Sequence, residues 1–320
     1  MFAWLILIAP ASLADASPNE WLQRMNLAFE QQDYDGRFSF FSGSHLASLR
    51  VVHKVIDGVT YERLVHLNGA PREIVREGEQ VLCILEPGDK LASMSGSIPA
   101  GPFARAFVRD LTQVSKQYRL SLHGSDRVAE RRAQRLRVQP RDKLRYGYSL
   151  WLDEATGLLL KSELTDAADG RALEIFQFTD ITIGDAVRQE DVAPPRKAGS
   201  MIDHLELAEQ RAVETREAAV RWQAGWLPPG FRMAASDLRN APATRQRISS
   251  LMYSDGIASL SVFVENVGEK RLKGMTSRRG ATVTVSRMTH GPNGAGHLVT
   301  VVGEVPLPTA QRIAKSVVHR

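Results

Sequence analysis

Three consecutive strand-like segments between residues 144 and 181 constrain this sequence more than any other feature. In the first segment Tyr146, Tyr148 and Leu150 alternate with residues of the opposite face, which is the two-residue period of a β-strand. The segments are separated by two stretches of turn composition, each ending in glycine. We therefore expect an antiparallel meander with one apolar face and one polar face. Such a sheet needs a helix, a second sheet or a ligand to cover its apolar face.

The same alternation of short strands and turns fills the preceding part of the chain. Asp57-Gly58 and Asn68-Gly69 each separate two alternating runs, which is a strong local hairpin signal. We interpret Asp35-Gly36 as a further turn, leading into an aromatic strand over residues 37–41. The pattern predicts an antiparallel sheet and argues against a parallel α/β fold.

Two amphipathic segments are predicted to cover this sheet. The first begins with a capping box at Ser17-Pro18-Asn19-Glu20 and continues with apolar residues at helical spacing over residues 21–29. The second runs from Pro102 to Val114 and follows a glycine- and serine-containing segment, residues 88–101, that we interpret as a loop. The expected fold class is therefore α+β.

The N-terminus carries an export signal. An apolar run over residues 2–9 is followed by proline and small residues, so we assign residues 1–16 to a signal peptide, one that lacks the usual positive start. Export from the cytoplasm makes nucleic acid an unexpected partner despite the formal net charge of +5. The single cysteine, Cys83, lies in an apolar run and is interpreted as a core residue.

The chain of 320 residues is long enough for two domains. We place the N-terminal domain at residues 17–184, a linker with a charged bridging helix at 185–222 and a C-terminal domain at 223–320. The C-terminal domain opens with a stiff corner at Trp226-Leu227-Pro228-Pro229-Gly230-Phe231. A hairpin around Asp255-Gly256 and a final helix from Pro308 predict a small α+β domain.

No catalytic constellation stands out, so the sequence predicts a binding protein and not an enzyme. Nucleophile elbows, phosphate loops and zinc-protease motifs are absent from the sequence. His45, His53 and His66 lack the spacing of a metal site, and we expect neither a metal nor a cofactor.

Several ordered motifs are similar to those of the RseB/MucB family of periplasmic sigma-E regulators. They are Tyr61-Glu62-Arg63-Leu64, His66-Leu67-Asn68-Gly69, Pro140-Arg141-Asp142, Arg145-Tyr146-Gly147-Tyr148, the turn at 153–157 with Leu160-Lys161-Ser162, the corner at 226–231 and residues 301–307. Together they extend from about Trp21 to Val318, nearly the whole mature chain.

The resemblance implies a half-open antiparallel β-barrel, similar to the lipoprotein carriers LolA and LolB, with helices covering its concave face, followed by a smaller C-terminal α+β domain. It implies a partner, the periplasmic segment of a membrane-bound anti-sigma factor (RseA/MucA-like), which the protein shields from site-1 proteolysis. Lipopolysaccharide or acylated lipoprotein is expected to displace that partner. The alternative function is a lipoprotein or lipid carrier. The sequence leaves open whether the protein forms a homodimer.

Two sets of candidate residues follow from the sequence and the resemblance. For an acyl ligand with a phosphorylated headgroup we single out Tyr146, Tyr148, Leu150, Arg135 and Arg137. For the anti-sigma segment we single out Trp226, Phe231, Arg271, Lys273, Arg278 and Arg279. The alternative is that the tyrosines and Trp226 with Phe231 are core residues, and that the basic side chains are merely solvated.

Overall fold

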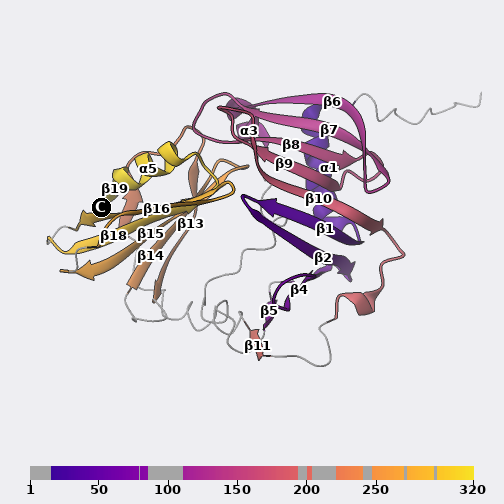
Figure 1. The fold of residues 1–320 in the computed structure, drawn as a ribbon, viewed down its shortest axis with the longest axis horizontal. Helices are drawn as coiled ribbons and strands as arrows, with labels where there is room; N and C mark the ends of the chain where they lie inside the picture. Colours follow the sequence, from indigo (N-terminus) through magenta and orange to yellow (C-terminus); the bar gives the residue numbers. More distant parts are fainter. Residues whose placement is uncertain are drawn as a thin grey trace, which may run out of the picture.

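The computed structural model divides the chain into a large N-terminal sheet and a smaller C-terminal sheet (Figure 1). It describes residues 16–78, 80–85, 111–193, 200–203, 221–240, 247–269, 272–291 and 294–320. The predicted signal peptide, nearly all of the bridging helix and the loop at 88–101 lie outside the described residues, apart from Ala16 and the two ends of the helix. Of the second predicted helix, α3 (Leu111–Gln117) is described.

Within the described residues, the N-terminal sheet has eleven strands in the order β11-β5-β4-β3-β2-β1-β10-β9-β8-β7-β6, and every pair is antiparallel. The strands are β1 (Tyr34–Ser42), β2 (His45–Ile56), β3 (Val59–His66), β4 (Arg72–Glu77), β5 (Gln80–Leu85), β6 (Tyr118–Val128), β7 (Arg131–Pro140), β8 (Gly147–Asp153), β9 (Leu159–Thr165), β10 (Ala172–Ile183) and β11 (Ser200–Asp203). The hairpin turns predicted at Asp57-Gly58 and Asn68-Gly69 are confirmed between β2, β3 and β4.

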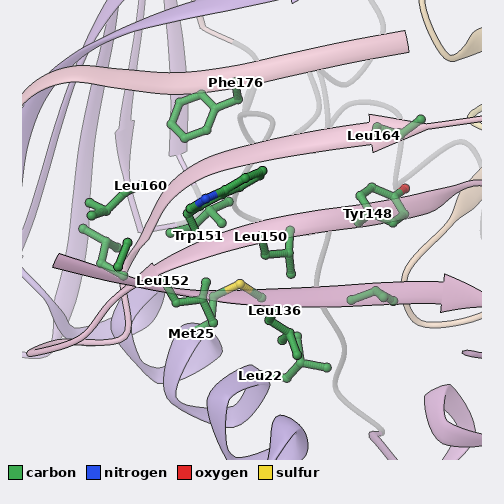
Figure 2. Packing of buried hydrophobic residues seen from close by; sticks show 14 of the residues in the cluster. Leu22, Met25, Leu136, Tyr148, Leu150, Trp151, Leu152, Leu160, Leu164 and Phe176 are labelled. Atoms are coloured by element: carbon green, nitrogen blue, oxygen red, sulfur yellow. The ribbon is translucent and has the colours of Figure 1, made fainter. Parts of the chain in front are cut away.

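Helix α1 (Pro18–Gln31) covers one face of this sheet, as predicted. Its capping box is formed, because the Ser17 hydroxyl accepts from the Glu20 amide while the Glu20 carboxylate accepts from the Ser17 amide. Figure 2 shows Leu22 and Met25 of α1 against Leu136 of β7 and Leu150 of β8. The apolar stripe of the helix therefore forms the N-terminal core together with the concave sheet face.

The turn predicted at Asp35-Gly36 is wrong, because both residues lie within β1. Gly36 has an extended backbone, and a Cβ atom there would lie 2.5 Å from the Phe178 ring of the neighbouring strand β10. The glycine is therefore explained by close packing of an aromatic ring on the strand and not by a positive φ angle.

The prediction of one apolar and one polar face is wrong for β8, all seven residues of which are buried. The face with Leu150 packs toward α1. On the other face Trp151 is covered by two cations, with the Arg135 guanidinium carbon 4.9 Å and the Lys161 ammonium 4.4 Å from its ring centroid. Long side chains from the two neighbouring strands thus bury the second face of a central strand.

The C-terminal part is the predicted α+β unit, in which the described ranges form a six-stranded antiparallel sheet with one helix packed on it. Its order is β13-β14-β15-β18-β17-β16, with α5 (Leu307–Ser316) packed on β17 and β18 (Figure 1). The strands are β13 (Arg232–Asn240), β14 (Arg247–Ser254), β15 (Ser259–Gly268), β16 (Met275–Arg279), β17 (Thr282–His290) and β18 (Gly296–Gly303), and β12 (Trp222–Ala224) pairs separately with β19 (Val317–His319).

Both ends of the predicted bridging helix are strands instead. Met201 lies in β11, which pairs with β5, and Trp222 lies in β12. The segment after β10 is also not a free linker, because Val187 and Val192 pack on Val52 of β2. At both described ends of the predicted helix, the backbone pairs with a neighbouring strand instead. The thin apolar stripe therefore did not predict the secondary structure there.

Among the described residues, no helix combines the length and apolar character needed to cross a membrane. Cys83 is fully buried with a free thiol, and burial raises the pKa of that thiol to about 11, in agreement with a core role.

Candidate functional site

The two domains meet in a buried interface that collects several of the predicted site residues. We define the interdomain interface by two sets of side chains. The N-terminal set is Ser42, Tyr118, Arg145, Tyr146, Tyr148 and Glu174, and the C-terminal set is Pro229, Phe231, Asp255, Ile257, Ala281 and Glu304.

Arg145 lies at the centre of this interface and is completely buried. Its guanidinium pairs with Asp142 of its own domain at 3.0 Å and with Asp255 across the interface. It also donates a hydrogen bond of 2.7 Å to the carbonyl oxygen of Pro229. These acceptors keep Arg145 charged in spite of its burial, and they raise its pKa against the opposing effect of desolvation.

Two aromatic rings, one from each domain, enclose the Arg145 guanidinium. The ring centroids of Tyr118 and Phe231 lie 5.5 and 5.6 Å from its central carbon. The Tyr118 hydroxyl donates to the Asp255 carboxylate at 2.9 Å, and burial is the main reason why the pKa of this hydroxyl is well above its usual range. The ion pair is therefore shielded from water on both sides.

Asp255 is presented to Arg145 by the tight turn between β14 and β15. One of its carboxylate oxygens accepts from the amides of Ile257 and Ala258, at 2.9 and 2.8 Å, and so shapes the turn itself. The other oxygen faces Arg145 and Tyr118 across the interface. One carboxylate thus shapes a local turn and also connects the domains.

A second turn of the C-terminal domain, between β16 and β17, contacts the paired ends of β1 and β10, where Ser42 lies opposite Glu174. The Glu174 carboxylate accepts from the Ala281 amide at 3.1 Å and from the Ser42 hydroxyl at 2.9 Å. Ala281 and Ile257, both from the C-terminal domain, pack within the hydrophobic core cluster of the N-terminal domain. The N-terminal core is therefore completed by residues of the other domain.

Glu304, which follows β18, adds a second carboxyl group near Glu174. Burial, and then repulsion by Glu174, raise the pKa of Glu304 to about 7. Burial also raises the pKa of Glu174, although the hydrogen bonds from Ala281 and Ser42 oppose the shift. The interface thus holds two carboxyl groups that favour a proton when the domains are in contact.

The structure places the three predicted acyl-contact residues inside the protein. Tyr146, Tyr148 and Leu150 are 1%, 7% and 0% exposed. Burial, and then the nearby charge of Glu304, raise the pKa of the Tyr148 hydroxyl well above its usual range. The buried hydroxyl of Tyr146 has no hydrogen-bond partner in the described part of the chain. The tyrosines therefore belong to the interdomain interface, and Leu150 to the packing against α1.

Arg135 and Arg137 are not brought together with those residues. The register pairs Arg135 with Trp151 and Arg137 with Ser149, so both arginines lie on the sheet face opposite to Leu150. Arg135 stacks on Trp151, whereas Arg137 is exposed. A single ligand on one sheet face would not contact both predicted groups.

The predicted partner-contact aromatics lie in different surroundings. Trp226 is half-buried, with the guanidinium carbon of Arg312 from α5 only 3.8 Å from its ring centroid, and its amide donates to the Ser316 hydroxyl. Phe231, at the end of the same corner, is 7% exposed and lies in the interdomain interface.

Two of the predicted basic residues of the C-terminal domain, Arg278 and Arg279, lie in β16, which is an edge strand with all five residues exposed. Lys273 precedes the strand and is exposed, and Arg271 lies outside the described residues. Arg278 donates to the Gly280 carbonyl at 3.0 Å and approaches Asp166 of the N-terminal domain at 3.9 Å. Arg279 ends the strand, within electrostatic range of Glu174.

Sequence reasoning missed the residues that connect the domains most directly. Asp255 was noticed only as a hairpin residue, and Arg145 only as the first residue of the motif Arg145-Tyr146-Gly147-Tyr148, without a structural role. Tyr118, Glu174 and Glu304 carried no signal, because their roles depend on which turns of one domain face the other. A charged residue directly before the apolar run 146–152 was the one available hint that Arg145 is buried.

No group of three or more metal-ligating side chains gathers within the described ranges. Of the three histidines considered above, His53 stacks on Tyr34 with 5.0 Å between ring centroids and bonds to the carbonyl of Gln32. Its surroundings are those of a core histidine.

Family models match both parts of the chain, the MucB/RseB N-terminal domain over residues 17–196 and the MucB/RseB C-terminal domain over residues 216–318. The chain belongs to the MucB/RseB family. It is 37% identical to the sigma factor AlgU regulatory protein MucB of Pseudomonas aeruginosa, covering 98% of this chain and 94% of that protein. It is 28% identical to the sigma-E factor regulatory protein RseB of Haemophilus influenzae, covering 99% and 96%.

Solved structures agree with this assignment. MucB in complex with the periplasmic part of MucA is 34% identical, with a TM-score of 0.76 over 94% of this chain and 98% of that chain. A second structure, of the Pseudomonas aeruginosa MucA/MucB complex, has the same identity and coverage and a TM-score of 0.77. The MucB/RseB family resemblance expected from the motifs is thereby confirmed over nearly the whole chain.

Proposed function

We propose that this protein is a periplasmic regulator of a sigma-E-type factor that acts by binding the periplasmic segment of a membrane-bound, MucA-like anti-sigma factor. One observation carries the proposal. The chain matches MucB across both domains, and MucB has been solved in complex with the periplasmic part of MucA. While bound, the protein shields that segment from site-1 proteolysis and keeps the stress response off.

We further propose that the protein acts through binding and not through catalysis, which agrees with the regulatory names of its relatives. Lipopolysaccharide or acylated lipoprotein is the proposed releasing signal. The exposed basic residues Lys273 and Arg279, next to an open strand edge, are proposed to attract acidic residues of the partner. The alternative of a lipid carrier leaves the C-terminal unit, matched by a family model over residues 216–318, without a role.

The test is a binding titration of the mature protein with the periplasmic segment of a MucA-like protein, with and without lipopolysaccharide. We expect tight binding that the amphiphile weakens. A protein that takes up acylated peptide but does not bind the segment would support the carrier function instead. As a matched control, the segment with its acidic residues replaced by amides should bind more weakly and with less dependence on salt.

A further inference from the structure

The interdomain interface combines a polar contact with an apolar contact. When the domains separate, water can take the place of the lost polar partners but not of the lost apolar partners. Arg145 and Asp255 are both completely buried and pair across the domains. If the domains separate, both ions regain water, so the desolvation that opposes their pairing is recovered. Opening therefore costs much less than deleting one member of the pair while the interface stays closed.

Opening the interface would also uncover an apolar site in the N-terminal domain. Ile257 is 5% exposed and Ala281 is 0% exposed, and both pack with the N-terminal core. Both lie in turns of the other domain, next to the polar contacts of Asp255 and Glu174. Withdrawal of these turns would leave an unfilled apolar surface beside Tyr146 and Tyr148, which an apolar chain could cover.

We infer that the contact of Arg145, Asp255 and Tyr118 is an interdomain latch, and that an acyl chain enters the N-terminal domain only when the latch opens, taking the place of Ile257 and Ala281. The consequence for the partner rests on the proposed function: the ligand releases the anti-sigma segment because it stabilises the open arrangement. A ligand shifts such an equilibrium only by its difference in affinity for the two states, and in the closed state Ile257 and Ala281 occupy the place that the chain would take.

A reversible disulfide across the interface tests the latch directly. The domains also approach closely where the Thr309 hydroxyl donates a hydrogen bond of 3.1 Å to the Leu144 carbonyl oxygen, so the double variant Leu144→Cys, Thr309→Cys is chosen for the cross-link, and its formation is checked by thiol titration. The native Cys83 is fully buried and does not compete. The oxidised form holds the domains closed, and the reduced form of the same protein is its matched control.

The readout is uptake of a fluorescent dodecanoic acid by the full chain. We expect the reduced variant to bind the probe and the oxidised variant to bind it about tenfold more weakly or not at all. Equal uptake by both forms, or no uptake by either form, would overturn the inference. Binding of the MucA-like segment is measured separately: its absence in the wild-type protein would refute the proposed function, while the probe would still decide the latch.

A second variant tests the latch without a new covalent bond. Tyr118→Phe removes the hydrogen bond to Asp255 but keeps the buried ring. We expect probe affinity to rise by about two- to tenfold, because the closed state loses one hydrogen bond. Tyr61→Phe is the matched control, since the Tyr61 hydroxyl bonds to Glu77 in an exposed position within the N-terminal sheet. A rise of the same size in both variants would contradict the latch.

Discussion

Arg145 and Asp255, 110 residues apart in the chain, form an ion pair in which neither side chain is exposed to solvent. The pair joins the loop before β8 to the turn between β14 and β15. Two domains that each have a core of their own are thus held in one arrangement by a contact that neither domain could complete alone.

The first prediction concerns this pair. Asp255→Asn keeps an oxygen for the turn amides but leaves the Arg145 charge buried without its interdomain partner. We expect the free energy of unfolding to fall by about 3 kcal/mol, measured by urea denaturation. Asp180→Asn is the control, because Asp180 pairs with Arg37 on the surface, with the two side chains 68% and 58% exposed. Equal effects of the two substitutions would show that the interdomain pair is not special.

The second prediction concerns pH. The pKa of Glu304 is about 7 in the folded protein, above its ordinary value of 4.5, so the folded state holds the proton more tightly than the unfolded state. Stability contributed by this proton is fully present below pH 4.5 and is lost as the pH rises to about 7. Thermal melting between pH 5 and pH 8 should therefore show falling stability.

The control for the pH prediction is a pair of amide variants. Glu304→Gln should flatten this pH dependence and stabilise the protein at pH 8, because the repulsion with Glu174 disappears. Glu190→Gln, at a carboxylate that is 70% exposed, should leave the pH dependence as in the wild-type protein. An unchanged slope in Glu304→Gln would assign the pH dependence to other groups.

The third prediction concerns α1 as the cover of the concave sheet face. Leu22→Ala removes a completely buried side chain that packs on the sheet, and we expect a loss of about 2–5 kcal/mol in the free energy of unfolding. Leu27→Ala, on the same helix but 51% exposed, should change stability by less than about 1 kcal/mol. Comparable losses in the two variants would place the buried face of α1 elsewhere.

The fourth prediction separates the two arginines that the sequence grouped together. Arg135 covers the Trp151 ring, so Arg135→Ala should expose the indole and lower the melting temperature. Arg137 is exposed on the same face with no bonding partner of its side chain among the described residues, so Arg137→Ala should melt like the wild-type protein. Amphiphile release that is unchanged in both variants would remove the arginines from the proposed ligand contacts.

Much of the local structure could be predicted from short-range chemistry. The capping box at Ser17, the hairpins at Asp57-Gly58 and Asp255-Gly256, and the helix over 307–316 all formed where the sequence indicated. Caps and tight turns depend on a few neighbouring residues, so the sequence specifies them directly. Among the predicted turns Asp35-Gly36 was wrong, because the glycine there makes room for the Phe178 ring of β10 and does not form a turn.

The sequence by itself therefore determined the antiparallel meanders, the hairpin turns at 57–58, 68–69 and 255–256, the α+β class and, through ordered motifs, the MucB/RseB family. Only the tertiary structure decided that Ser42 lies beside Glu174, 132 residues away, and that Tyr146 and Tyr148 face the second domain. Such contacts depend on long-range strand pairing and on the fit between two folded domains. Burial of Arg145 follows from that fit, because its charge is tolerated only where both domains supply acceptors.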